Sequence, residues 1–325
     1  MSAPQVASGT KRTLVQVPCM QVAGEEAVVD VAESRGATDL ARRRLTRKAA
    51  ARYNRNENAV GAGGNRAAGE RRGDTMSDYL TITPENVREV PLACIIRKKP
   101  GHPGIEAKRA WLAERLAEGH VFRKLCDPAS CAFIEYAPLE TAWVPVEGKN
   151  YLYIYCLWVA GDAKGHGHGA RLMESCIEEA RRLGKSGVCM LGADKQKAWL
   201  SDQAFAAKYG FRPVDTAPGG YTLLALSLDG TTPHFAAGAK RGTVDESGLV
   251  IYYDDQCPFL PARVETLRAY CEEKGIQAEF RHVGSLAEAK ALPSVFNNFA
   301  VFWNGQLITV NQIDPKMLDR IVKSK

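Results

Sequence analysis

Hydrophobic positions between residues 79 and 228 follow two alternating periods, one typical of strands and one typical of helices. A period of two, or a short apolar run, predicts strands at 79–82, 120–126, 131–136, 151–159, 188–192 and 221–228. Apolar residues three and four positions apart predict helices at 87–96, 106–117, 170–183 and 198–209. This order of elements is typical of a mixed α/β (α+β) domain.

Two of these elements have the clearest patterns. Residues 151–159 are apolar on both faces, which predicts a central strand covered on both sides. The helix at 170–183 has one apolar face, made of Leu172, Met173, Cys176, Ile177, Ala180 and Leu183. Gly184 follows as a stop signal, after two arginines in the last turn.

A second series of elements follows a polar segment. Residues 229–247 are broken by Gly and Pro and are predicted to be a linker. Beyond them the pattern predicts strands at 249–253, 277–282, 299–303 and 306–309, and helices at 261–274, 286–291 and 315–323. Asn304-Gly305 predicts a hairpin turn. We therefore expect one domain at 76–228 and a smaller one at 248–325.

Composition sets residues 1–75 apart. They are rich in Ala, Gly, Arg and Asn, contain a single aromatic residue, Tyr53, and carry +5 of the net charge of +6. Such a segment cannot bury enough apolar surface to offset its ordering entropy, which predicts a disordered basic extension. Met76 looks like a natural start. The alternatives are nucleic-acid contact by the Arg-rich run at 42–48, a transit peptide, or a partner-binding segment.

The composition of the rest argues against several classes of protein. Residues 76–325 are nearly neutral, so nucleic-acid binding is not expected outside the extension. No apolar run approaches 18 residues, so we expect no membrane span. Nine cysteines, an odd number without a C-x-x-C pair, indicate a reducing cytoplasm rather than a disulfide framework.

Three glycines at alternate positions separate the central strand from the amphipathic helix. Gly165, Gly167 and Gly169 allow tight turns with positive φ. The unpaired amides and the dipole at the start of a helix favour an anion there, and a pyrophosphate suits such a loop. A flexible loop with incidental glycines is the alternative.

This segment resembles a motif of a known family. Residues 164–169, Lys-Gly-His-Gly-His-Gly, resemble motif A (Q/R-x-x-G-x-G/A) of the GNAT acetyltransferases, and residues 205–211 resemble that family's helix ending in aromatics and Gly-Phe. Residues 84–87 and 93–97 resemble the start of YoaP-type acetyltransferases, which carry an extra C-terminal domain. The resemblance implies a mixed, mainly antiparallel sheet with flanking helices.

The resemblance also implies a reaction. Acetyl-CoA would be the cosubstrate, and a small-molecule or peptide amine would attack the thioester directly, without a covalent enzyme intermediate. Backbone groups of the splayed strand would polarise the thioester carbonyl. The residues implied in cofactor binding are Leu157, Trp158, Val159, Lys164, Gly165, His166, Gly167, His168, Gly169 and Ala170.

The acid and the base depart from the family pattern. Many members use a Tyr to protonate the leaving thiolate, but that position is Ala206 here. Tyr209 is the substitute, and a proton from water or from the product ammonium is the alternative. Glu135, inside an apolar strand, is the candidate base, although it could be a solvent-facing carboxylate. Without a clear acid, a non-catalytic acyl-CoA-binding module is a second interpretation.

Two histidines in the loop raise the question of a metal. His166 and His168 are two residues apart, but only Asp162 among carboxylates and thiols is near them in sequence. We expect no metal, and instead expect the histidines to add positive charge near the phosphates.

The C-terminal elements resemble a small thioredoxin-like α/β domain. Cys257 stands where oxidoreductases keep their first cysteine, but Leu260 occupies the place of the second. Dithiol exchange is therefore not expected. A thiol-based redox response through Cys257, a scaffold, a homodimer contact and a cover that shapes the substrate site are the alternatives.

We expect deletion of residues 1–75 to leave folding and activity intact, because the pattern places every predicted element after Met76. A melting curve and a rate measurement on the truncated chain test this. A lower melting temperature or a lower rate than the full chain would contradict it.

Overall fold

The computed structural model describes residues 78–92, 94, 102–127 and 130–323. The predicted extension at 1–75 and most of the second half of the helix predicted at 87–96 lie outside these residues. Residues 84–89, which include the start of that helix, form turns instead. Pro91 explains the difference, because proline has no amide hydrogen for a helical bond and disfavours helical backbone at Val90 before it.

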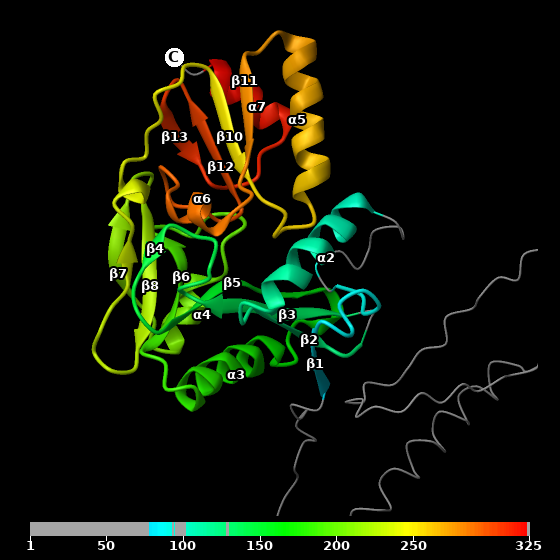
Figure 1. Cartoon of the computed structure of the whole chain (residues 1–325), viewed down its shortest axis with the longest axis vertical. Helices are drawn as coiled ribbons and strands as arrows, with labels where there is room; N and C mark the ends of the chain where they lie inside the picture. Colours follow the sequence, from blue (N-terminus) through cyan, green and yellow to red (C-terminus); the bar gives the residue numbers. More distant parts are fainter. Residues whose placement is uncertain (1–77, 93, 95–101, 128–129, 324–325) are drawn as a thin grey trace, which may run out of the picture. The chain divides into compact units, whose positions relative to one another are not determined.

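A seven-stranded sheet forms the first layer of the structure, in the order β1-β2-β3-β5-β6-β8-β7 (Figure 1). Its strands are β1 (Tyr79–Thr81), β2 (Val121–Leu125), β3 (Cys131–Pro138), β5 (Tyr151–Ala160), β6 (Gly187–Ala193), β7 (Arg212–Ala217) and β8 (Tyr221–Ser227). Only β5 and β6 pair in parallel, and the other pairs of this sheet are antiparallel. The expected mixed, mainly antiparallel sheet is thus confirmed, and β5 is central as predicted.

Helices cover both faces of this sheet (Figure 1). On one face, α3 (His168–Arg182) and α4 (Gln203–Lys208) bury their apolar residues against Ile134, Tyr136 and Ile154. On the other, α2 (Pro103–Leu116) packs Trp111 and Leu112 against Phe122 and Phe133. α2 begins with proline at its first position, where the missing amide hydrogen costs nothing.

A four-stranded sheet, in the order β11-β10-β12-β13, follows in the C-terminal part. It consists of β10 (Leu249–Tyr253), β11 (Ala278–His282), β12 (Phe299–Trp303) and β13 (Gln306–Thr309), with helices α5 (Leu260–Lys274), α6 (Leu286–Lys290) and α7 (Pro315–Lys323). The predicted hairpin is present, since Asn304 and Gly305 adopt φ of 47° and 80° between β12 and β13. The small α/β fold of this part is therefore confirmed.

The segment predicted as a linker packs onto the first sheet region. Strand β9 (His234–Phe235) pairs with β4 (Val146–Glu147), and a 3₁₀ turn, η4 (Gly238–Lys240), follows. Phe235, Ala236 and Ala239 in this segment are buried. Residues 76–325 accordingly form one compact unit.

Three direct contacts show how closely the two sheet regions are joined. The Lys290 ammonium donates to the carbonyls of Leu139 and Val146 at 2.7 and 3.1 Å. The Val310 amide donates to the Tyr221 hydroxyl at 2.9 Å. At the start of α2, a Cβ placed on Gly104 would lie 1.8 Å from the Pro258 carbonyl oxygen. A side chain at residue 104 would therefore push the two regions apart.

We expect Gly104→Ala to lower the free energy of unfolding by about 1–3 kcal/mol, because the added methyl overlaps backbone atoms that cannot rotate away. Urea titration followed by circular dichroism measures the change. Gly284→Ala is the matched control, since its Cβ would meet no atom closer than 3.8 Å. Equal stability of the two variants would contradict the close approach.

Candidate functional site

The strands β5 and β6 separate halfway along β5, and this opens an edge in the middle of the sheet. Their parallel register runs from Tyr151 and Gly187 to Ile154 and Met190, while β5 continues to Ala160 paired with β3. Beyond that point the Leu157 amide points away from β3 and donates to the Ser201 hydroxyl at 3.1 Å. A strand interrupted in this way leaves backbone polar groups that a ligand can use.

The direction of the Leu157 amide identifies which backbone groups face the opening. Because successive residues of a strand point their backbone groups to opposite edges, Val159 shares the open edge with Leu157. Trp158, opposite Phe133 in the register, directs its backbone to β3 instead. Its indole is 49% exposed. Of the three predicted strand residues, two therefore offer backbone groups to the opening and Trp158 offers a side chain.

The glycine loop forms a cradle of amides at the start of α3. Gly165 and Gly167 have φ of 83° and 78°, the left-handed conformation that favours glycine, and Gly167 is the N-cap of the helix. The amides that follow belong to the first helical turn and have no partner within the helix. A Cβ placed on Gly165 would meet no atom within 4 Å, so the loop has open space beside it. A diphosphate fits this arrangement.

The two loop histidines take different positions. His166 is exposed, whereas His168 is 7% exposed and its Nδ1 lies 2.7 Å from the Tyr79 hydroxyl. The His168 ring is thus bonded in the protein interior, and its backbone amide belongs to the helix start. Arg171, which the sequence interpretation did not include, places its guanidinium 3.1 Å from the His166 carbonyl oxygen. No group of three or more His, Cys, Asp or Glu side chains suited to a metal occurs in the described ranges.

The remaining loop glycine joins the loop to α4. A Cβ on Gly169 would lie 3.7 Å from both Phe205 and Val159, so the loop, α4 and the open edge meet there. The Tyr209 ring lies tilted against the Phe205 ring, with 5.1 Å between the ring centroids. Burial, with a smaller effect of Glu174, raises the pKa of Tyr209. Ala206 is fully buried in the core under α3, so a larger side chain at this position would displace core atoms.

Glu135 is deeply buried rather than solvent-facing, with 1% exposure. Its Oε1 accepts from the Lys108 ammonium and lies 2.8 Å from His120 Nε2, and its Oε2 accepts from Gln256 Nε2 at 2.7 Å. Burial by itself would raise the pKa of Glu135, but Lys108 and His120 outweigh burial and hold the pKa below its ordinary value. The carboxylate is therefore ionised and carries three protein partners.

The partners of Glu135 come from three separate parts of the chain. Lys108 lies on the buried face of α2 with Gly104, Trp111 and Leu112. A lysine on an otherwise apolar helix face is a signal that the sequence offered. His120 directly precedes β2, and Gln256 follows β10 in the C-terminal part. No local pattern predicts the approach of Gln256, because 121 residues separate it from Glu135.

Glu135 and Tyr209 lie on opposite faces of the sheet. Glu135 faces α2 beside Phe133, whereas Tyr209 packs with the residues under α3. Cys156 stands opposite Glu135 in the register, and burial raises its pKa. The structure therefore brings Glu135 close to the start of the open edge and keeps Tyr209 on the side of the glycine loop.

Cys257 lies in the same buried region. Gln312 Nε2 donates to its sulfur at 3.2 Å, and burial raises its pKa despite a hydrogen bond from the Phe259 amide. A raised pKa keeps the thiol protonated, which is the unreactive form. Asp254, three residues earlier, is 1% exposed, and burial raises its pKa to about 8.

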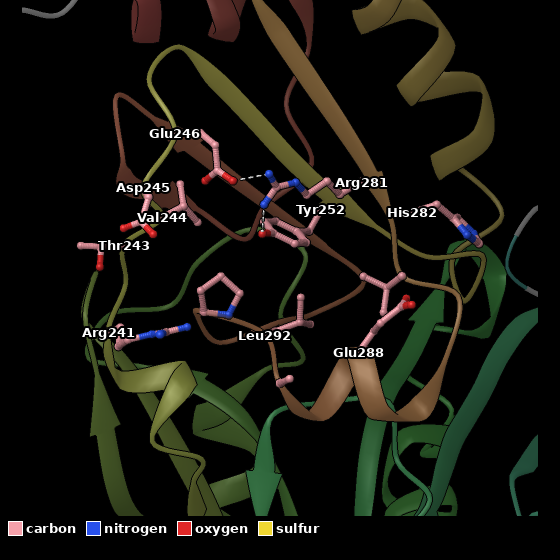
Figure 2. Close-up of a pocket in the computed structure, with 13 residues that line it drawn as sticks. Arg241, Thr243, Val244, Asp245, Glu246, Tyr252, Arg281, His282, Glu288 and Leu292 are labelled. Atoms are coloured by element: carbon pink, nitrogen blue, oxygen red, sulfur yellow. Dashed lines mark hydrogen bonds and ion pairs between the residues drawn. The ribbon is translucent and has the colours of Figure 1, made fainter.

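A separate cavity of 670 Å³ opens in the C-terminal part, as Figure 2 shows. It is lined by Arg241 and residues 243–246, by Tyr252 and residues 281–283, and by Glu288 of α6 with the residues that follow this helix. Arg281 inside it donates to Tyr252 at 2.6 Å and pairs with Glu246, so its charge is already neutralised. None of its lining residues belongs to the glycine loop, to β5 or to the Glu135 cluster.

Comparison with known proteins gives two matching family regions and one close relative. Residues 97–211 match the acetyltransferase (GNAT) family, and residues 278–320 match the YoaP-like family. The "Uncharacterized N-acetyltransferase YoaP" of Bacillus subtilis (strain 168) is 36% identical over 233 residues, which cover 71% of this chain and 92% of the relative.

Solved acetyltransferases resemble the chain over about half its length. A GNAT family acetyltransferase from Brucella melitensis in complex with acetyl-CoA is 16% identical, with a TM-score of 0.31, and covers 48% of this chain and 91% of its own. The acetyltransferase yncA from Salmonella typhimurium with acetyl-CoA is 15% identical, with a TM-score of 0.33, and covers 48% and 96%.

Among the residues that the structure describes, no helix has the length and apolarity needed to span a membrane. The Bacillus subtilis relative is 36% identical and its match covers 71% of this chain, so the chain belongs to the GNAT acetyltransferase family, and its C-terminal part carries a YoaP-like region.

Proposed function

We propose that this chain binds acetyl-CoA at the glycine loop and transfers the acetyl group to a primary amine by direct attack at the open edge of β5. The observation that carries the proposal is the junction of two features, the amide cradle at the start of α3 and the separation of β5 from β6. A Cβ placed on Gly169 would lie 3.7 Å from Val159 Cγ2, so the two features adjoin. One extended thioester can therefore occupy both.

Each part of the cosubstrate meets a suitable group. The amides from Gly165 to Ala170 and the Lys164 ammonium bind the pyrophosphate, assisted by the helix dipole. The Val159 amide and the carbonyls of Leu157 and Val159 hold the pantetheine arm as a neighbouring strand would, while the Leu157 amide is bonded to Ser201. The thioester carbonyl then lies beside the open edge, where backbone amides stabilise the charge that grows on its oxygen.

Ser201 supports the departure of the sulfur in this proposal. Its oxygen accepts from the Leu157 amide, so its own hydrogen is available to a group in the opening. When the amine nitrogen bonds to the acetyl carbon and the C–S bond breaks, this hydroxyl donates a hydrogen bond to the thiolate. The proton that the thiolate finally takes comes from the product ammonium, directly or through water. Tyr209 stays the alternative donor.

Glu135 as the base stays a prediction, and its contacts suggest how it would act. Both carboxylate oxygens already accept hydrogen bonds from protein groups. Contact with an amine therefore requires a water or an exchange of one partner. We propose that Glu135 acts on the acceptor side mainly by holding Lys108 and α2 in place. No observation favours a redox function of Cys257, because burial raises its pKa.

We expect purified protein to bind acetyl-CoA with measurable heat and to release free thiol with at least one amine of a panel of amino acids, aminoglycosides and peptides with a free N-terminus. Gly167→Val should abolish the heat of binding, because a β-branched residue resists the φ of 78° that the cradle requires. Isothermal calorimetry and a thiol reagent measure the two quantities.

Gly184→Val is the matched control for this experiment. Gly184 ends α3 with φ of 61° in open space, so the substitution introduces similar strain, about 1–2 kcal/mol, away from the loop. Loss of binding in both variants would indicate unfolding rather than a lost cradle. Binding without thiol release from any amine would favour the non-catalytic module, and no binding in the unaltered protein would refute the proposal.

We expect Ser201→Ala to lower kcat by about tenfold or more while the Kd for acetyl-CoA changes little, because the lost hydrogen bond forms as the sulfur departs. Tyr209→Phe is compared in the same assay, since it removes the alternative hydroxyl and keeps the ring on Phe205. A loss of kcat in Tyr209→Phe alone would assign the donor to Tyr209 and reject Ser201.

A further inference from the structure

We propose that Gln256, from the C-terminal part of the chain, is a positioning residue for the acetyl-transfer site and acts through Glu135 on the side of the amine acceptor. The proposal rests on the proposed function and extends it. It assigns the C-terminal part of the chain, which also contains the YoaP-like region at 278–320, a role in the reaction of the GNAT part.

Both polar atoms of the Gln256 side chain are hydrogen-bonded, and these bonds fix which way the side-chain amide points. The residue is 5% exposed and lies between β10 and α5. Its Oε1 accepts from Asn298 Nδ2 at 2.8 Å, so its Nε2 must face the Glu135 carboxylate, to which it donates at 2.7 Å. Its backbone amide donates to Asp254 Oδ1 at 3.0 Å. The side chain therefore presents one donor, in one orientation, to one carboxylate.

The carboxylate that Gln256 reaches stands where the sheet opens. Glu135 is opposite Cys156 in the register, and Cys156 directly precedes Leu157, the first residue of the open edge. The other ligands of the carboxylate tie it to α2 through Lys108 and to β2 through His120. Gln256 thus fixes a group that sets the distance between α2 and the open edge.

The C-terminal part also holds the segment that carries Ser201. Asn297 Nδ2 donates to the Trp199 carbonyl at 3.0 Å, and the Trp199 ring meets Phe259 at 6.0 Å. Trp199 adopts φ of 65°, which is costly for a bulky residue and is maintained by such contacts. Two sides of the opening are therefore held by residues from the same C-terminal region.

One contact between the two sheet regions does not involve Glu135 or its partners. The hydrogen bond from the Val310 amide to the Tyr221 hydroxyl, at 2.9 Å, involves β8 and the end of β13. Its loss leaves a buried amide without a partner, a defect comparable to the loss of Gln256. Tyr221→Phe therefore separates the general joining of the two regions from the particular contact of Gln256 with the carboxylate.

Several titratable groups surround Glu135 and share its environment. They are Lys108 of α2, His120 before β2, Tyr155 and Cys156 of β5, Asp254 after β10, and Cys94. Gln256 is neutral at every pH, so it stabilises the ionised carboxylate without adding a charge. A carboxyl group at position 256 would add a negative charge when it is ionised.

The experiment compares Gln256→Ala, Gln256→Glu and Tyr221→Phe in the full chain, with the amine of the panel that gives the fastest thiol release. We expect Gln256→Ala to lower kcat/KM for the amine by about tenfold to a hundredfold, because a small displacement of an acceptor wall is costly. The Kd for acetyl-CoA should stay within about twofold of the unaltered protein, as the cradle is untouched. Tyr221→Phe should lower the melting temperature without this loss of kcat/KM.

Gln256→Glu supplies a readout that a purely structural role would not move. When the new carboxyl is protonated it donates to Glu135 Oε2 as the amide did, and when ionised it repels the carboxylate. The nearby charge raises the pKa of the new carboxyl, so the rescued state exists below that raised pKa and is lost as pH rises through it. The ratio of variant to unaltered rate should fall with rising pH, whereas the ratio for Gln256→Ala should stay low throughout.

Three outcomes overturn the proposal. They are an unchanged kcat/KM in a folded Gln256→Ala, an equal loss in Tyr221→Phe, and a ratio for Gln256→Glu that does not depend on pH. A rise in the Kd for acetyl-CoA in Gln256→Ala would also count against it, because it would move the effect to the cofactor side. Failure of the proposed function is distinct, since it appears as absent binding or absent thiol release in the unaltered protein.

Discussion

A carboxylate inside the protein depends on the groups that compensate its charge, and Glu135 depends on three regions of the chain at once. Lys108 supplies the opposite charge, while His120 and Gln256 complete the hydrogen bonds. Removing one partner of a buried ion pair costs about 3–5 kcal/mol, because the remaining charge cannot reach water. Glu135 therefore couples the position of α2 to β3 and to the packing of the C-terminal region. The acceptor side of the proposed reaction would be built on this cluster.

The proposed cofactor side depends mainly on backbone geometry. The separation of β5 from β6 exposes polar groups, and the left-handed glycines turn the chain so that the first amides of α3 lie beside them. These two features are formed by the main chain, and their main requirement is that Gly165 and Gly167 carry no side chain. The site thus combines a cradle of main-chain donors on one face of the sheet with a buried ionic cluster on the other.

Local patterns predicted most of the secondary structure, because apolar periodicity reports directly which side of an element is buried. The central strand, the helix after the glycine loop, the Asn304-Gly305 hairpin and the C-terminal elements all follow from it. The start of the helix predicted at 87–96 forms turns instead, because Pro91 cannot continue a helix. The polar segment at 229–247 looked like a linker, yet Phe235 and Ala239 within it pack into the core.

Sequence by itself was sufficient for the family, the glycine loop and the candidate strand, since short segments carry each of these signals. Only the folded chain revealed that Glu135 is enclosed, that Tyr209 lies on the other face of the sheet, and that Ser201 bonds the open edge. Gln256 is the clearest case, because its proposed role depends on a hydrogen bond to Glu135, which is 121 residues away in the sequence. Periodicity records the burial of a position, whereas the partner of a buried polar group is set by how distant segments pack.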